Sequence, residues 1–529
     1  MSTDDPISQA RATGLPRDDG RRWQLLDPAT AVRAPGAPEP RATVYERSTV
    51  LVGGLPGGRA SARLSQITEV AEQMGWSATV LEDERALAGR VAEATAQGEL
   101  RELAEDTWVT RVQLAPAGRA PQAPPDAWHL LQQLLARDAK ASADVGLDHL
   151  VRACEIGGVP FWVGHPFWVG HPFWVGHPFW VGHGGGSPVT TYAQPGMGGR
   201  SPVAVVAGDP SRHAPRPDRP PVVAVPDTGL GAHPWYDGHP GVIRGVTYAG
   251  LPIGGDEADQ GDGAVEGLDG TLAPLAGHGT FIAGLLRQGA PAASILPLGV
   301  MDAGGSVSES DLLRALALLL LRHVDGQRGG RPDEVIDVLS LSLGYYHETP
   351  QDAITTSFLR VLLDRYGAHG VVVVAAAGND ATTEPLLPAG FAADRDAPDH
   401  VGHRVPLVSV GALNPPGDTA AFFSNDGSRV SCWRPGAALV STLPTSFEGA
   451  GQEGAETVPT GFHPRGTIDL DDFTSGFGIW SGTSFAAPVL AAEVLAHLTG
   501  AGDLADTDPD AMVARGWDAV RAVVRWERP

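Results

Sequence analysis

The stretch SGTSFAAPVLAA, residues 481–492, determines how the second half of this chain is interpreted. It places Ser484 among small residues, directly ahead of an apolar run that is typical of a tightly packed helix. The positive end of such a helix would lie near the Ser484 hydroxyl. A serine in this position is a candidate nucleophile, and a nucleophilic serine needs a base and a carboxylate elsewhere in the chain.

Short apolar runs rich in β-branched residues alternate with helical stretches from Pro220 to Thr499. The runs are PVVAVPD (221–227), ASILPLGV (293–300), VIDVLSLSLG (335–344), GVVVVAAAGN (370–379) and VPLVSVGAL (405–413). This alternation predicts an α/β fold with a parallel, twisted sheet that has helices on both faces. Active sites in such sheets lie at the carboxyl ends of the strands.

Two polar residues stand at such ends. Asp227 closes the first run in VVAVPDTG, and His278 begins the helical stretch AGHGTFIAGLL. A neutral imidazole can take the proton of a serine hydroxyl as the oxygen attacks a carbonyl, and a buried carboxylate can hold that imidazole in the required tautomer. Asp227, His278 and Ser484 are therefore the candidate catalytic residues.

In this chain order the three segments resemble the Asp, His and Ser motifs of the subtilisin-like serine proteases, the subtilases of peptidase family S8. The resemblance implies a serine endopeptidase that acts on polypeptide substrates through an acyl-enzyme intermediate and requires no cofactor. It further implies that the Asn379 side chain helps to bind the oxyanion. By the same resemblance, the strand that pairs with the substrate backbone contains Ser342, Leu343 and Gly344.

The sequence also departs from the family pattern. Pro226 precedes Asp227 where an aliphatic residue is usual, and Tyr345 stands where a second glycine is common, so Tyr345 is expected to narrow or reshape the pocket for the residue before the scissile bond. The insertion GGDEADQGDGAVEGLD, residues 254–269, is acidic enough to suggest calcium, which many relatives bind. Because it lacks a recognisable ligand spacing, a solvated loop is the favoured interpretation, and no residue is assigned as a metal ligand.

Composition shifts divide the chain into five parts. Residues 1–42 are predicted to be disordered, and residues 43–150 to form a small α+β domain. This domain is either prodomain-like, as the family resemblance suggests, or an independent binding module. Residues 151–217 are interpreted as a linker, 218–500 as the catalytic domain and 501–529 as a helical tail.

The linker contains the hexapeptide PFWVGH four times without a substitution, residues 160–183. Perfect identity points to recent duplication, because the side chains of one functional site would differ in environment. Zinc bound by the four histidines and a hexapeptide β-helix are alternatives, but a variable aromatic linker outside the active site is favoured. If the α+β domain is a prodomain, we expect cleavage in the glycine-rich tract 184–217.

A net charge of −24 and a pI near 5.0 argue against nucleic-acid and anionic-membrane partners. The apolar run 312–321 is too short to span a bilayer and is interpreted as a buried helix capped by Ser308. No signal peptide is visible, so the sequence predicts a cytoplasmic protein, with unconventional export and the oligomeric state left open.

Two other functions agree with only part of this pattern. A non-catalytic peptide-binding protein on a subtilisin-like scaffold would not need Asp227, His278, Asn379 and Ser484 together. An aspartic protease built on DTGLGA, residues 227–232, would leave the Ser484 segment unexplained.

Overall fold

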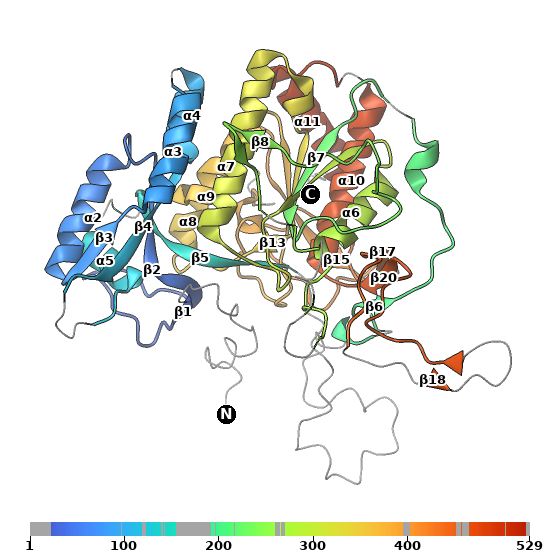
Figure 1. The fold of residues 1–529 in the computed structure, drawn as a ribbon, viewed down its shortest axis with the longest axis horizontal. Coiled ribbons are helices and arrows are strands. Elements are labelled where there is room, and N and C mark those ends of the chain that lie inside the picture. Colours follow the sequence, from blue (N-terminus) through green and yellow to red (C-terminus); the bar gives the residue numbers. More distant parts are fainter. Residues whose placement is uncertain are drawn as a thin grey trace, which may run out of the picture.

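The computed structural model describes residues 23–524. The exceptions are residues 97, 119–122, 139–140, 142, 155–191, 196, 216, 256, 260–264, 266–269, 395–402, 451–455, 458–464 and 503. A smaller amino-terminal unit lies beside a larger unit (Figure 1).

The larger unit is built on a six-stranded sheet whose paired strands are all parallel, in the order β10-β7-β12-β14-β15-β16. The strands are β7 (Val222–Asp227), β10 (Ser294–Gly299), β12 (Val338–Leu341), β14 (Val372–Ala376), β15 (Val408–Leu413) and β16 (Cys432–Pro435). Each of the five apolar runs contributes one strand to this sheet, and the run 335–344 also contains the short strand β13 (Leu343–Gly344). The predicted α/β fold is confirmed.

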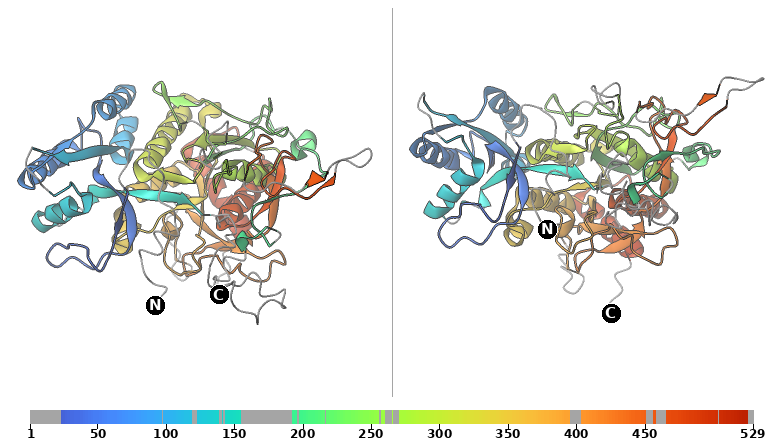
Figure 2. Two further views of the ribbon diagram at one scale, coloured as in Figure 1. Left: turned by 60° about the horizontal axis from the view of Figure 1, so that its bottom comes forward. Right: turned by 90° about the horizontal axis from the view of Figure 1, so that it is seen from below.

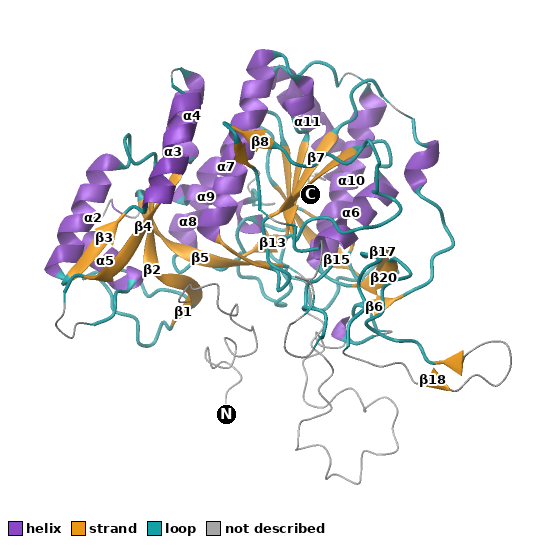
Figure 3. Ribbon diagram, in the orientation of Figure 1, coloured by secondary structure: helices purple, strands orange, loops and turns teal. Residues whose placement is uncertain are grey.

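Helices cover both faces of this sheet (Figure 3). One apolar cluster joins Val223 and Val225 to α6 (His278–Gly289), α10 (Thr483–Ala501) and α11 (Pro509–Val524). A second cluster joins the alternate strand residues to α7 (Glu309–Gly329), α8 (Pro350–Thr356) and α9 (Phe358–Ala368). Strand side chains alternate between faces, which is why these runs are apolar throughout.

The predicted buried helix is α7, and its cap is as expected: the Ser308 hydroxyl accepts the backbone N–H of Asp311 at 3.2 Å. Within the described residues, one helix, α10, is long and apolar enough to cross a bilayer by length and composition. It packs between α6, α11 and the sheet, as expected of the core helix of an α/β unit.

The amino-terminal unit is an antiparallel sheet with helices, which confirms the predicted α+β region. Its strands are β1 (Trp23–Leu26), β2 (Thr43–Gly53), β3 (Trp76–Thr79), β4 (Val109–Pro116) and β5 (Val145–Ala153), and its helices are α2 (Ser61–Gln73), α3 (Glu82–Ala94), α4 (Glu99–Thr107) and α5 (Ala127–Arg137). Strand β1 pairs with β2, so residues 23–26, expected to be disordered, belong to this sheet.

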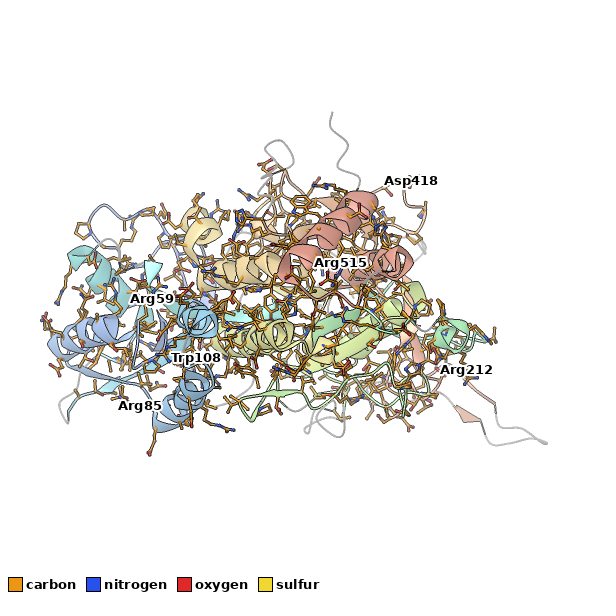
Figure 4. All side chains as sticks on the ribbon, turned by 90° about the horizontal axis from the view of Figure 1, so that it is seen from above. Arg59, Arg85, Trp108, Arg212, Asp418 and Arg515 are labelled. Carbon is orange, nitrogen blue, oxygen red and sulfur yellow. The ribbon has the colours of Figure 1, made fainter. Side chains whose placement is uncertain are left out.

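The two units share an apolar contact. Trp108, labelled in Figure 4, is 2% exposed and lies in the same cluster as Leu312 of α7 and Leu359 of α9. Strand β5 also runs from one unit into the other (Figure 2). It pairs with β2 and then, antiparallel, with β11 (Ser306–Ser308) and β13 (Leu343–Gly344) of the larger unit. The domain boundary expected at residue 150 therefore falls inside a strand.

Part of the expected linker is also structured. Strand β6 (Ser201–Pro202) pairs with β20 (Phe477–Trp480), which pairs with β17 (Leu439–Thr442). The remaining short elements are β8 (Thr247–Tyr248), β9 (Leu251–Pro252), β18 (Glu456–Thr457), β19 (Arg465–Gly466) and the 3₁₀ helices η3 (Pro210–His213), η5 (Pro332–Glu334) and η6 (Ala389–Phe391). The PFWVGH repeat lies outside the described residues.

Candidate active site

The three candidate catalytic residues come from three elements. Asp227 is the last residue of β7, His278 the first of α6 and Ser484 the second of α10, and all three are fully buried. Gly279 must be a glycine, because a Cβ there would lie 2.3 Å from the carbonyl oxygen of Gly229. This close approach brings the start of α6 against the end of β7.

Asp227 and His278 are in direct contact. Nδ1 of His278 lies 2.7 Å from Oδ1 of Asp227, which also accepts the Thr228 N–H at 2.8 Å. A carboxylate beside Nδ1 favours the tautomer that carries its proton on Nδ1 and leaves Nε2 as an acceptor. Nε2 of His278 is buried and has no partner among the described residues. His278 can therefore act as a base through Nε2, with its ring oriented by the Asp227 carboxylate.

The Ser484 side chain points to a different partner. Its hydroxyl donates to the carbonyl oxygen of Ser342 at 3.1 Å, and the Ser342 hydroxyl donates to the Ser484 carbonyl oxygen at 2.8 Å. No hydrogen bond joins Ser484 to His278, although Phe485, the next residue, packs on the His278 ring with centroids 5.3 Å apart.

Asn379, which follows β14, is held by one neighbour. Its side-chain oxygen accepts the backbone N–H of Thr483 at 2.9 Å and the Thr483 hydroxyl at 2.8 Å. The amide nitrogen is buried and has no partner among the described residues. An amide fixed in this way offers a free donor, as an oxyanion site requires. The sequence analysis identified Asn379 but not Thr483, since the contact is made only in the folded chain.

A segment of the chain itself lies in the site. The backbone N–H of Cys154 donates to the Ser342 carbonyl oxygen, and the Cys154 carbonyl oxygen accepts the Ser484 N–H, both at 2.9 Å. One residue earlier, the Ala153 N–H donates to the Gly305 carbonyl oxygen at 3.0 Å. An extended peptide thus lies between β11 and β13, with one carbonyl group at the nucleophile candidate. The sequence analysis missed both Cys154 and Gly305.

The two tyrosines after Gly344 differ from expectation. Tyr345, expected beside the pocket for the residue before the scissile bond, instead donates its hydroxyl to Glu309 at 2.7 Å. Tyr346 packs against the apolar cluster that includes Cys154, and its hydroxyl donates to Asp380 at 2.6 Å. Successive residues of an extended chain point to opposite sides, so the two tyrosines have different partners.

Asp259 is a further residue that the sequence analysis missed. It is fully buried and accepts the N–H of Gly277 at 2.9 Å, the N–H of Thr280 at 3.0 Å and the Thr280 hydroxyl at 2.7 Å. Burial raises the pKa of Asp259 to about 6. These bonds fix the first turn of the helix that begins at His278. The surrounding acidic insertion concealed this role. Most of that insertion, interpreted above as a solvated loop with calcium as the alternative, lies outside the described residues.

Among the described residues, one group of potential metal ligands comes close together. Atoms of His149, His347 and Glu348 lie within 4.8 Å of one another. Nδ1 of His347, however, already accepts the Thr349 N–H at 3.0 Å, and His149 lies at hydrogen-bond distance from two carboxylates. We therefore interpret this group as an ion-pair cluster.

A parallel sheet that places an aspartate–histidine pair and a serine at its carboxyl edge defines an α/β protein of the serine-hydrolase type. Residues 218–514 match the profile of the Subtilase family, Peptidase_S8, and the chain therefore belongs to this family of serine proteases.

Relatives cover part of the chain. Subtilisin E of Bacillus subtilis (strain 168) is 26% identical over 182 residues, which are 33% of this chain and 40% of the relative. The thermophilic serine proteinase of Bacillus sp. (strain AK1) is 30% identical over 222 residues, 42% of this chain and 45% of the relative. The chain thus spans less than half the length of these two relatives. Among solved structures, fervidolysin from Fervidobacterium pennivorans, a keratinolytic enzyme related to subtilisin, has 19% identity and a TM-score of 0.45, and the match covers 87% of this chain and 55% of that one.

Proposed function

We propose that this chain is a serine endopeptidase with Asp227, His278 and Ser484 as its catalytic triad. The observation that carries the proposal is the position of Cys154, whose carbonyl oxygen accepts the Ser484 N–H while the residues before it pair with β11 and β13. A peptide recognised through its main chain is the geometry expected of a protease substrate.

In this mechanism the Ser484 hydroxyl leaves the Ser342 carbonyl and turns to Nε2 of His278. The imidazole takes the proton as the oxygen attacks the substrate carbonyl, and Asp227 stabilises the imidazolium that forms. The Ser484 N–H and the free amide nitrogen of Asn379 bind the oxyanion. His278 then protonates the leaving amine, and water hydrolyses the acyl-enzyme by the reverse sequence of proton transfers.

The first substrate on this proposal is the chain itself. The carbonyl at Ser484 belongs to Cys154, so the bond cleaved is Cys154–Glu155 rather than one in the tract 184–217. The amino-terminal unit would then act as a prodomain, because after cleavage its last residues still fill the site. No step of this mechanism uses calcium, which stays the less favoured alternative for the acidic insertion.

A second candidate is a non-catalytic peptide-binding protein. One observation favours it: the Ser484 hydroxyl is bonded to Ser342 and not to His278. In that case the segment ending at Cys154 would be a permanent occupant of the groove.

The two candidates are separated by the full-length protein and its Ser484→Ala variant. We expect the wild type to yield a fragment that begins at Glu155, to hydrolyse casein and to react with a fluorophosphonate probe, whereas Ser484→Ala should stay intact and inactive. Ser475→Ala, which removes an exposed hydroxyl, is the matched control. An uncut wild type with no casein hydrolysis and no labelling would favour the binding protein.

A further inference from the structure

Five residues before Cys154, the side chain of His149 lies between two carboxylates of the larger unit. Its Nδ1 is 2.5 Å from Oε2 of Glu309, the first residue of α7, and its Nε2 is 2.7 Å from Oε2 of Glu348, which follows β13. The exposed fractions of these side chains are 2%, 3% and 5%. The contact is therefore buried at the junction of the two units.

With both glutamates ionised, this geometry selects a cation at the His149 position. Two carboxylate acceptors need two N–H donors, and an imidazole ring has both only when it is protonated. The ring of Tyr345 is stacked on His149, with centroids 4.6 Å apart and an angle of 23° between the planes, and its hydroxyl holds the other oxygen of Glu309. An aromatic face adds to the attraction for a cation.

Both carboxylates belong to the larger unit, whereas the cation belongs to β5 of the amino-terminal unit. Among the described residues, the other basic group whose charge acts on Glu348 is His347. Burial lowers the pKa of His347, and its Nδ1 accepts the Thr349 N–H, so this ring is not a replacement cation. When the amino-terminal unit leaves, Glu309 and Glu348 still converge on a position that has lost its positive charge. A peptide that buries these carboxylates again must supply a positive charge there, because buried carboxylates without a cation are costly.

We propose that Glu309 and Glu348 form a cation-binding subsite, which selects peptide substrates with a basic side chain at the position of His149. This proposal rests on the proposed protease function, because the substrate position is numbered from Cys154, the residue whose carbonyl group lies at Ser484. Strand β5 is extended from residue 149 to Cys154, so the two positions are about 17 Å apart at roughly 3.3 Å per residue. To reach this subsite, a substrate needs at least six residues on the amino-terminal side of the scissile bond.

The test uses fluorogenic peptides with the sequence of residues 147–156, LDHLVRACEI, and the active protein obtained from the full-length chain. We expect peptides with Arg, Lys or protonated His at the third position to have a kcat/KM at least tenfold above the Gln peptide, and the Glu peptide to be the poorest. Moving the basic residue to the second position, that of Asp148, should remove the advantage. In Glu348→Gln and in the Glu309→Gln, Glu348→Gln double variant the preference should shrink or vanish. Glu334→Gln, a partly exposed control that pairs with Arg331, should retain it.

Equal cleavage of the Arg and Gln peptides by a protein that hydrolyses casein would overturn the subsite and leave the protease assignment intact. A second measurement does not depend on catalysis. In the full-length Ser484→Ala protein, His149→Gln should lower the melting temperature at pH 6.5, and adding Glu309→Gln and Glu348→Gln should restore part of the loss. An unchanged melting temperature for His149→Gln would show that the carboxylates need no cation and would overturn the proposal even for an inactive protein.

Discussion

The Asn379 amide is a donor because another residue uses its oxygen. Both bonds from Thr483 go to that oxygen, so the nitrogen is left without a partner among the described residues. The position of Asn379 after a buried strand could be predicted from the sequence, because the strand pattern and the family resemblance agree there. The parts played by Thr483 and Asp259 could not, since their contacts join segments that are far apart in the chain.

Replacing Asn379 by Ala should lower kcat by roughly 10²–10³, about 2.7–4 kcal/mol, the size typical of losing one oxyanion donor in this family of enzymes. KM should change little, because the amide bonds the transition state more strongly than the bound substrate. Steady-state kinetics on a fluorogenic peptide measures both, with Asn414→Ala as the control. A change confined to KM would make Asn379 a substrate-binding residue instead.

Some strands can be predicted from the sequence and others cannot. Five of the six parallel strands are largely apolar, because both of their faces are covered, and the sequence predicts them. The sixth, β16, is only partly buried and was not predicted. Strand β5 is interrupted by Asp148 and His149 and was not predicted. Both residues are buried only because the larger unit supplies partners: Asp148 accepts the Ser310 hydroxyl and N–H, and His149 meets Glu309. From the sequence alone, a polar residue whose partner lies in the other unit looks the same as a polar residue on the surface.

The pairing of β5 with β11 leads to a second prediction. Proline cannot donate a backbone hydrogen bond, so Ala153→Pro removes the bond to the Gly305 carbonyl next to the nucleophile candidate. We expect self-cleavage after Cys154 to slow by at least tenfold, followed as the appearance of the fragment by electrophoresis and mass spectrometry. Ala153→Ser, which keeps the N–H, should cleave at the wild-type rate. Equal rates for the proline and serine variants would mean that this main-chain bond is not used in cleavage.

The two units are joined by a shared strand, by apolar packing, by the cluster around His149 and by ion pairs between helices, such as Arg365 with Asp106. Apolar packing around Trp108 joins the helices, and the cluster around His149 joins β5 to the larger unit. The sequence indicated two folded units, but it placed their boundary at residue 150, within β5. Composition does not change within a strand that belongs to both units, so the boundary could not be found from composition.

The PFWVGH repeat lies between these units in the sequence, and its role stays a prediction. Deleting residues 165–176, two of its four units, should leave peptide hydrolysis within about threefold of wild type, below about 0.7 kcal/mol in the barrier. Assays with and without added zinc, on the wild type and the deletion variant, measure this effect. A folded deletion variant that has lost hydrolysis would place the repeat in the active site.

The cluster around His149 should also make the union of the two units depend on pH. The groups that face this ring are Glu309, Glu348, Tyr345 and His347, and the two carboxylates outweigh burial and raise the pKa of His149 from 6.5 to about 10. A group whose pKa is raised in the folded protein contributes its full stability below its unfolded pKa and loses it as the pH rises through the folded value. The stabilisation is therefore complete below pH 6.5 and disappears by about pH 10, and after cleavage at Cys154 an alkaline medium should favour release of the amino-terminal unit.

Calorimetry measures this effect as the difference in melting temperature between the full-length Ser484→Ala protein and its His149→Gln variant. The contributions of other titrating groups are the same in both proteins and cancel in this difference. The melting temperature of the parent should exceed that of its His149→Gln variant most at pH 6.5, and the gap should close toward pH 10. The same comparison with His497→Gln, which removes a half-exposed histidine paired with Asp518, should show no such gap. Because the pKa of Glu348 is lowered to about 2, acid should not open the cluster above pH 4. A gap between parent and His149→Gln that stays constant from pH 6.5 to 10 would mean that His149 is not charged in the folded protein.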